Sequence, residues 1–133
     1  MKKLLSILAL ALLPGCAVVD SYLMKYDGGE YQIITEIRHD ASVYKQECAN
    51  PLMSMTNSIA LSRKTEFYVM YTEHTPHDKE VFASAKALND IAQGLSDQYT
   101  KSDKVSPLFC KIKFETIEHS AETMQKIIGA KPR

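Results

Sequence analysis

Apolar residues between positions 106 and 129 recur at alternating spacings of four and three, and this periodicity constrains the fold more than any other feature. Because 3.6 residues complete a turn, such spacing places the side chains on one face of an α-helix. Ser106 and Pro107 form a start signal, Gly129 is expected to supply a left-handed cap, and Pro132 prevents continuation. The stripe consists of Cys110, Phe114, Ile117, Ala121, Met124 and Ile128.

A second helix is expected to begin with Thr75 as its cap. Pro76 would lie in the first turn and Asp78 three residues after the cap, an arrangement that resembles a capping box with a shorter acid. Gly94 lies within this helix and indicates either close packing or a weak point, because glycine is a poor helix former. The apolar stripe consists of Val81, Ala85, Leu88, Ala92, Leu95 and Tyr99.

A third helical pattern follows Gly28 and Gly29 and ends before Pro51, since the residue preceding a proline disfavours helical backbone. We expect the two glycines to form a flexible break ahead of this helix. Its stripe again alternates spacings of three and four. The stripe residues are Ile34, Ile37, Ala41, Tyr44 and Cys48.

Residues 52–72 carry a weaker pattern. A drifting helical stripe can be drawn through their apolar side chains, whereas the run from Phe67 to Tyr71 also fits a strand. We favour a helix, because a single strand would leave its backbone groups without partners. The drifting stripe consists of Leu52, Met55, Ile59, Phe67 and Met70. Four helices with short connections predict an all-α fold, an antiparallel four-helix bundle.

The first 16 residues carry a separate signal. Lys2 and Lys3 precede an apolar segment, residues 4–13, which is too short to span a bilayer as a helix, and Leu13-Pro14-Gly15-Cys16 follows. This order is typical of a secretory signal peptide and resembles the signal of bacterial lipoproteins. The resemblance implies that residues 1–15 are cleaved and that Cys16 is lipidated, with a diacylglyceryl group on its thiol and an acyl group on its new amino terminus.

Lipidation at Cys16 would divide the protein into a signal peptide (1–15), a lipidated tether (16–29) and a helical bundle domain (30–133). Two or more acyl groups hold a protein stably on a membrane. Ala17 after Cys16 resembles the outer-membrane address of enteric bacteria, so the expected location is the periplasmic face of the outer membrane rather than the inner membrane. Tether residues such as Tyr22 and Tyr26 could rest on lipid or on the bundle.

Export into an oxidising compartment makes Cys48 and Cys110 a candidate disulfide, because the lipidated Cys16 leaves only this pairing. In an up-down-up-down bundle, the end of the first helix and the start of the fourth lie at the same end. Cys48 ends the first stripe and Cys110 begins the fourth, so their thiols can approach one another. A bond across 62 residue steps would stabilise the fold by about 4 kcal/mol on a loop-closure entropy estimate.

Composition argues against a nucleic-acid partner. Cleavage of the signal peptide removes Lys2 and Lys3, leaving 14 basic and 16 acidic residues that are interspersed along the sequence. Proteins that bind polyanions instead cluster Lys and Arg on one surface.

Metal ligands are sparse. A di-iron bundle site needs two Glu-x-x-His pairs facing the interior, and only Glu36-x-x-His39 fits, with neither residue on the apolar stripe. Four potential ligands lie together near Pro76, but their positions around a helix start point them in different directions. These four are Glu73, His74, His77 and Asp78. We expect no metal site.

Catalytic patterns are also missing. The sequence contains no Gly-x-Ser-x-Gly motif and no glycine-rich phosphate loop. Glu115 and Glu118 have the spacing of charges on a solvated helix face, and His119 is expected at the surface. We therefore expect a protein that is not an enzyme, with no cofactor and no small-molecule substrate.

The expected function is that of a membrane-anchored, non-enzymatic module that binds another envelope protein. Cys16, the helix count and the placement of Cys48 and Cys110 resemble the type II secretion pilotins, which implies a chaperone of an outer-membrane secretion protein as one alternative. The segment from Asp20 to His39 resembles uncharacterised phage-encoded lipoproteins, which implies exclusion or interference at the envelope as another.

Overall fold

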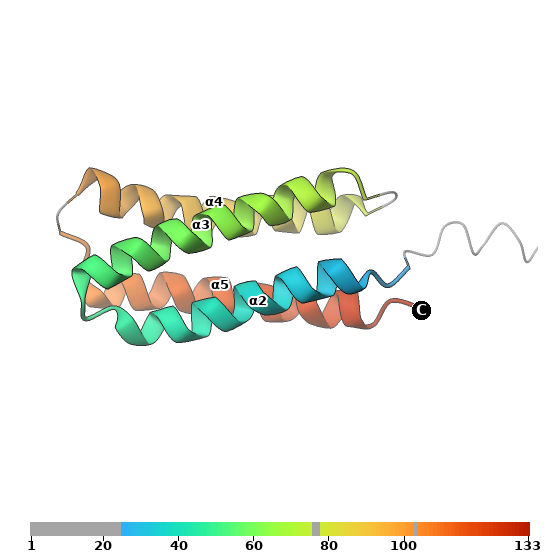
Figure 1. Ribbon diagram of the computed structural model, residues 1–133, viewed down its shortest axis with the longest axis horizontal. Coiled ribbons are helices and arrows are strands. Elements are labelled where there is room, and N and C mark those ends of the chain that lie inside the picture. Colours follow the sequence, from blue (N-terminus) through green and yellow to red (C-terminus); the bar gives the residue numbers. More distant parts are fainter. Residues whose placement is uncertain (1–24, 76–77, 103) are drawn as a thin grey trace, which may run out of the picture.

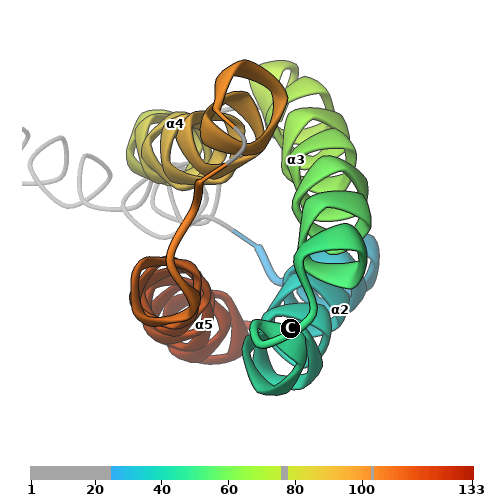
Figure 2. The same ribbon diagram turned by 90° about the vertical axis from the view of Figure 1, so that its left-hand side faces the viewer.

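The computed structural model describes residues 25–75, 78–102 and 104–133. They form four α-helices and, after the first of these, a short 3₁₀ helix; no strand occurs in these ranges. The elements are α2 (Gly28–Tyr44), η1 (Lys45–Glu47), α3 (Pro51–Glu73), α4 (Lys79–Lys101) and α5 (Pro107–Gly129). Consecutive helices run in opposite directions (Figure 1), and the view along the bundle shows them in ring order (Figure 2). The prediction of an all-α antiparallel four-helix bundle is confirmed.

Capping side chains set where three of the helices begin. The Asp27 carboxylate accepts hydrogen bonds from the backbone N–H groups of Gly29 and Glu30 at 2.8 and 3.3 Å and starts α2. Asn50 caps α3 ahead of Pro51, and Ser106 caps α5 as predicted. Each cap satisfies a backbone donor that the first helical turn leaves unpaired.

The predicted start of α4 is wrong by three residues. The cap is Asp78 and not Thr75, because the Asp78 carboxylate accepts a 3.1 Å hydrogen bond from the N–H of Val81. The backbone N–H of Thr75 instead bonds to the carbonyl of Thr72 and closes the end of α3. Pro76 lies outside the described residues.

Three of the predicted stripes form the core. Every stripe residue of α5 is buried, and the stripe of α4 is buried except for Tyr99, which is half-buried. The stripe from Ile34 to Cys48 is divided between two elements, because α2 ends at Tyr44 and Cys48 follows η1. The largest buried apolar side chains are Ile34, Ile37, Leu61, Tyr68, Leu88, Leu95, Phe114, Ile117 and Ile128.

Residues 51–73 form a helix, α3, as favoured, but no residue of the predicted stripe is fully buried, and only Met55 and Ile59 are half-buried. Leu52, Phe67 and Met70 are exposed, with 70%, 56% and 63% of their surface accessible. Apart from Leu61 and Tyr68, the buried face carries small polar side chains, and most of their hydroxyls bond to carbonyls of α3 itself. The buried polar residues are Ser54, Asn57, Ser58, Ser62, Thr65 and Thr72.

The glycines play roles that differ from those predicted. Gly28 and Gly29 are the first residues of α2 and not a break before it. Gly129 ends α5 without a left-handed backbone; a Cβ there would lie 3.2 Å from the Tyr31 ring, so close approach explains the glycine better than a cap does. Gly94 has nothing within 4 Å of a Cβ position, which makes it a weak point rather than a packing site.

The bundle has two distinct ends. The disulfide end holds the last turn of α2, η1, the start of α3, the end of α4 and the start of α5, and the tether end holds the opposite helix termini and the C-terminus of the protein (Figure 1). The α3–α4 and α2–α5 pairs pack most extensively. The disulfide end and the tether end therefore differ in which connections and side chains they expose.

Candidate functional site

The two cysteines predicted to pair are joined at the disulfide end. The Cα atoms of Cys48 and Cys110 lie 5.8 Å apart and their sulfur atoms 2.03 Å apart. Cys48 follows η1 and Cys110 lies in the first turn of α5, and both are buried. The bond therefore fixes the end of the α2–η1 segment against the start of α5.

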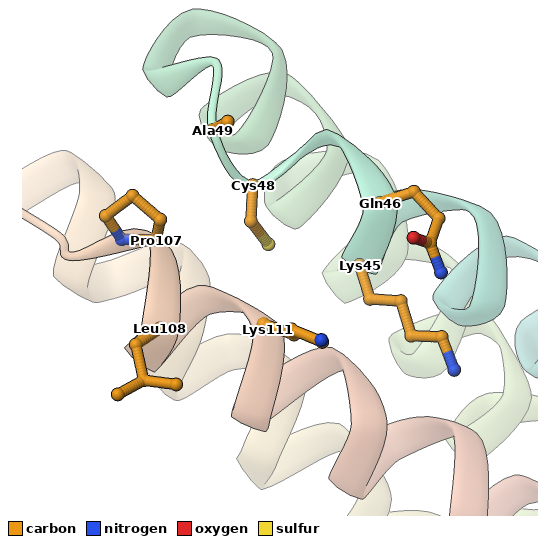
Figure 3. Close-up of a pocket in the computed structure, with 7 residues that line it drawn as sticks. All are labelled: Lys45, Gln46, Cys48, Ala49, Pro107, Leu108 and Lys111. Atoms are coloured by element: carbon orange, nitrogen blue, oxygen red, sulfur yellow. The ribbon is translucent and has the colours of Figure 1, made fainter.

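A shallow cleft of ≈ 290 Å³ lies beside the disulfide, between η1 and the start of α5 (Figure 3). Lys45 and Lys111 extend from its two walls, and Leu108 lies at its α5 side. The cleft is lined by Lys45, Gln46, Cys48, Ala49, Pro107, Leu108 and Lys111. The arrangement combines apolar surface with two ammonium groups.

Apolar side chains gather at the same end. Of the nine exposed large apolar side chains in the described residues, five lie in the first two turns of α3 or α5. These five are Leu52, Met53, Leu108, Phe109 and Ile112. Exposed apolar groups gathered at one end of a small domain are typical of a protein-binding surface, because a partner that covers them removes apolar area from water.

Lysines surround the apolar residues of α5. Lys104, Lys111 and Lys113 form no ion pair with any carboxylate in the described part of the protein. The Lys113 ammonium lies 5.3 Å from the centre of the Phe109 ring, within the range of a cation–π contact. Lys45 differs, because its ammonium pairs with Glu118 at 2.5 Å.

The tether end contains a buried polar cluster that the sequence patterns did not predict. The Lys131 ammonium lies between the carboxylates of Asp78 and Glu30, 3.2 Å from the latter, and the Tyr68 hydroxyl donates to Glu30 at 3.5 Å. All four side chains are almost inaccessible to solvent. The one signal of a buried acid is the position of Glu30, four residues before Ile34 on the same helix face.

Burial and pairing act in opposite directions within this cluster. The pKa of Glu30 is raised, mainly by burial, although Lys131 acts in the opposite direction. Burial alone would lower the pKa of Lys131, but its contacts with Asp78 and Glu30 outweigh that effect and raise it. Burial beside the Glu30 carboxylate also raises the pKa of Tyr68. The cluster holds the C-terminal residues against the starts of α2 and α4.

The tether joins the bundle beside this cluster. The Tyr71 hydroxyl donates a 2.8 Å hydrogen bond to Asp27, and the N–H of Tyr26 bonds to the carbonyl of Pro132. The Arg133 guanidinium lies 5.3 Å from the centre of the Tyr26 ring. Residues 26–29, assigned to the tether, are thus in contact with the folded domain.

The side chains weighed as metal ligands do not converge. Within the described residues, no three His, Cys, Asp or Glu side chains are grouped to hold a metal ion. Glu36 pairs with Lys64 and His39 is exposed, while Asp78 points inward to Lys131 and His74 outward. His77 lies outside the described residues.

A second shallow cleft, between α2 and α5, brings Ser42, His39 and Glu118 near one another. The Ser42 hydroxyl donates to the backbone carbonyl of His39, and Glu118 is held by Lys45. No hydroxyl–imidazole–carboxylate relay of the kind used by serine nucleophiles forms here. His119 lies at the surface, as expected, and Glu115 is half-buried.

Cys16, the predicted lipidation site, lies outside the described residues. None of the described helices has the length and apolar character needed to cross a bilayer. Comparison with models of protein families, with curated proteins and with solved structures finds no match to this protein.

Proposed function

We propose that this protein is a lipoprotein anchored through Cys16 to the outer membrane, facing the periplasm, where it acts as a non-enzymatic module that binds another envelope protein. The observation that carries the proposal is the Cys48–Cys110 disulfide. It occurs in a protein whose leader and first tether residue form the run Leu13-Pro14-Gly15-Cys16. Disulfides are typical of exported proteins and rare in reducing compartments. The fold and the leader thus favour the same compartment.

The geometry suits an anchored binding module. The twelve residues from Cys16 to Asp27 can reach at most about 40 Å when extended. The tether joins α2 at the tether end of the bundle, and a helix of 23 residues such as α3 is about 35 Å long. An anchor at Cys16 would therefore attach the bundle by its tether end, with the apolar and cationic side chains of the disulfide end one helix length from the point where the tether joins.

A pilotin-like chaperone of an outer-membrane secretion protein is the second candidate. Two features behind that resemblance, the helix count and the joined Cys48 and Cys110, are present in the fold. A fold alone does not fix a function, so the partner decides between this candidate and a general adaptor. The phage-related alternative has no structural observation in its favour.

Membrane fractionation tests the anchor. The full-length protein with its own leader is expressed in a Gram-negative bacterium beside the Cys16→Ala variant. We expect the wild-type protein in the outer-membrane fraction and the variant in the periplasmic extract, with the Cys48–Cys110 bond formed in both. Continued fractionation of Cys16→Ala with the outer membrane, or a wild-type protein that never leaves the cytoplasm, would contradict the proposal.

A further inference from the structure

The first two turns of α5 present apolar side chains in a regular arrangement. Leu108 and Ile112 are four residues apart, so they share one face of the helix, and each exposes half or more of its surface. Phe109 stands on a neighbouring face beneath the Lys113 ammonium. These three residues form a short apolar ridge, which we name the α5 ridge.

The cleft of Figure 3 adjoins the α5 ridge. Leu108 belongs to both, and the opposite wall is formed by η1 and Ala49. A cleft with a partly apolar lining beside an apolar helical ridge fits side chains of an amphipathic helix, which anchors itself through residues three, four and seven apart. The disulfide stabilises the floor of the cleft, so the site is formed before a partner arrives.

The charges around the α5 ridge select the partner. Lys104, Lys111 and Lys113 carry no ion pair with the described carboxylates. Two exposed apolar side chains elsewhere have a different setting: Met70 lies on α3 near Glu66 and Glu73, and Ile127 lies beside Lys126, which is paired with Glu122. Arg63, which is unpaired in the described structure, lies four residues before the exposed Phe67 on α3, but Glu66 adjoins Phe67 there. The α5 ridge differs in having two unpaired lysines, Lys111 and Lys113, within the same two helical turns as three exposed apolar side chains.

We infer that the α5 ridge and its cleft bind an acidic amphipathic helix of a partner protein. Its apolar side chains cover Leu108, Phe109 and Ile112, and its carboxylates pair with Lys111 and Lys113. This inference rests on the proposed function, because it names the kind of partner that the anchored module takes. An apolar centre with a charged rim gives both affinity and selection against basic partners.

Site-specific photocrosslinking in the native envelope tests the inference with the full-length, anchored protein. A photoreactive amino acid replaces Ile112 and, in separate proteins, Met70 or Ile127, which are exposed to a similar degree at 63% and 53% against 50%. Peptide sequencing then identifies what each position captured. We expect Ile112 to capture a protein segment in which Asp and Glu flank apolar residues at helical spacing, and Met70 and Ile127 to capture little of it.

Charge reversal sharpens the test. Lys111→Glu with Lys113→Glu should lower the yield at position 112 by about tenfold, because each substitution replaces attraction by repulsion at the rim. Lys79→Glu with Lys86→Glu on α4 changes the net charge equally and should leave the yield unchanged. All four lysines are at least partly exposed, so an unchanged melting temperature shows that the variants fold.

Other products at position 112 would overturn the inference. These are adducts with lipid, with a second copy of the protein, with its own residues 16–24 or with a basic segment, and also a yield that charge reversal does not alter. Protein adducts at Met70 or Ile127 alone would overturn the inference but leave the proposed function intact. Absence of protein adducts at all three positions would contradict the proposed function as well.

Discussion

The Lys131 ammonium group lies 3.2 Å from a carboxylate oxygen of Glu30, although the two residues are 101 positions apart in the sequence. Only 6% and 1% of these side chains are accessible, so solvent screens the pair poorly. Asp78 shares the same ammonium group. The C-terminal segment is therefore part of the folded domain and not a trailing end.

Loss of Lys131 should destabilise the bundle strongly. In Lys131→Met the carboxylates of Glu30 and Asp78 remain buried without their cation, and breaking a buried pair in this way costs about 3 kcal/mol. Lys126→Met, which removes an exposed lysine from α5, serves as the matched control and should change stability little. Urea denaturation followed by circular dichroism measures both. Equal effects of the two substitutions would contradict the burial of the cluster.

Glu30 should give stability a specific pH dependence. Burial raises the pKa of Glu30 in the folded protein, so the folded state holds this proton more tightly than the unfolded state does. Its contribution to folding is therefore present below the ordinary value of 4.5 and is lost as pH rises through the raised pKa. We expect the unfolding free energy of wild type minus that of Glu30→Gln to fall over this range. A difference that increases with pH would contradict the shift.

The disulfide should behave as one unit. Cys48→Ala and Cys110→Ala should each lower the unfolding free energy by up to about 4 kcal/mol, and the double variant should add little to either. Thermal denaturation with and without a reducing agent measures these effects. Reduction should destabilise only the wild type. Additive losses from the two substitutions would show that the thiols are not bonded.

The orientation of α3 can be tested by paired truncations. Phe67→Ala should change stability by less than about 1 kcal/mol, because the ring is already exposed, whereas Leu61→Ala should cost about 2–5 kcal/mol. Chemical denaturation compares the two variants directly. A larger loss of unfolding free energy from Phe67→Ala than from Leu61→Ala would mean that the predicted stripe, and not the observed face, packs in the core.

Alanine substitutions at two helical glycines should change stability in opposite directions. Gly94→Ala should stabilise the fold by about 0.5–1 kcal/mol, because a methyl group there meets open space and alanine favours helix. Gly29→Ala should destabilise it, because the added carbon would lie 2.5 Å from the Tyr71 hydroxyl, which bonds to Asp27. Melting temperatures that shift in opposite directions are expected. Stabilisation by both substitutions would contradict the close packing at Gly29.

The sequence predicted the helices whose buried faces are apolar. In α5 and α4 the periodicity identified the buried residues directly, because burial of apolar surface decides which face turns inward. The periodicity failed in α3, where serine hydroxyls donate hydrogen bonds to backbone carbonyls of the same helix. Such side chains can be buried without a partner on another helix. Phe67 and Met70, the apolar residues that the periodicity placed inside, are consequently exposed.

The candidate site was predicted only in part. Topology brought Cys48 and Cys110 to the same end, because antiparallel helices fix which termini meet. The surroundings of the disulfide could not be predicted, since one wall of the cleft is formed by η1, a 3₁₀ turn after α2 that the apolar periodicity did not indicate. The Lys131 contacts were also missed, because residues after the last helix carry no periodic signal that would indicate burial.

Attachment of the module to lipid through Cys16 is tested most directly by mass spectrometry of the N-terminal peptide from purified membranes. We predict a peptide that begins at Cys16 and carries a diacylglyceryl group on sulfur and an acyl group on nitrogen. An unmodified Cys16 thiol, or a peptide that still contains residues 1–15, would contradict this attachment.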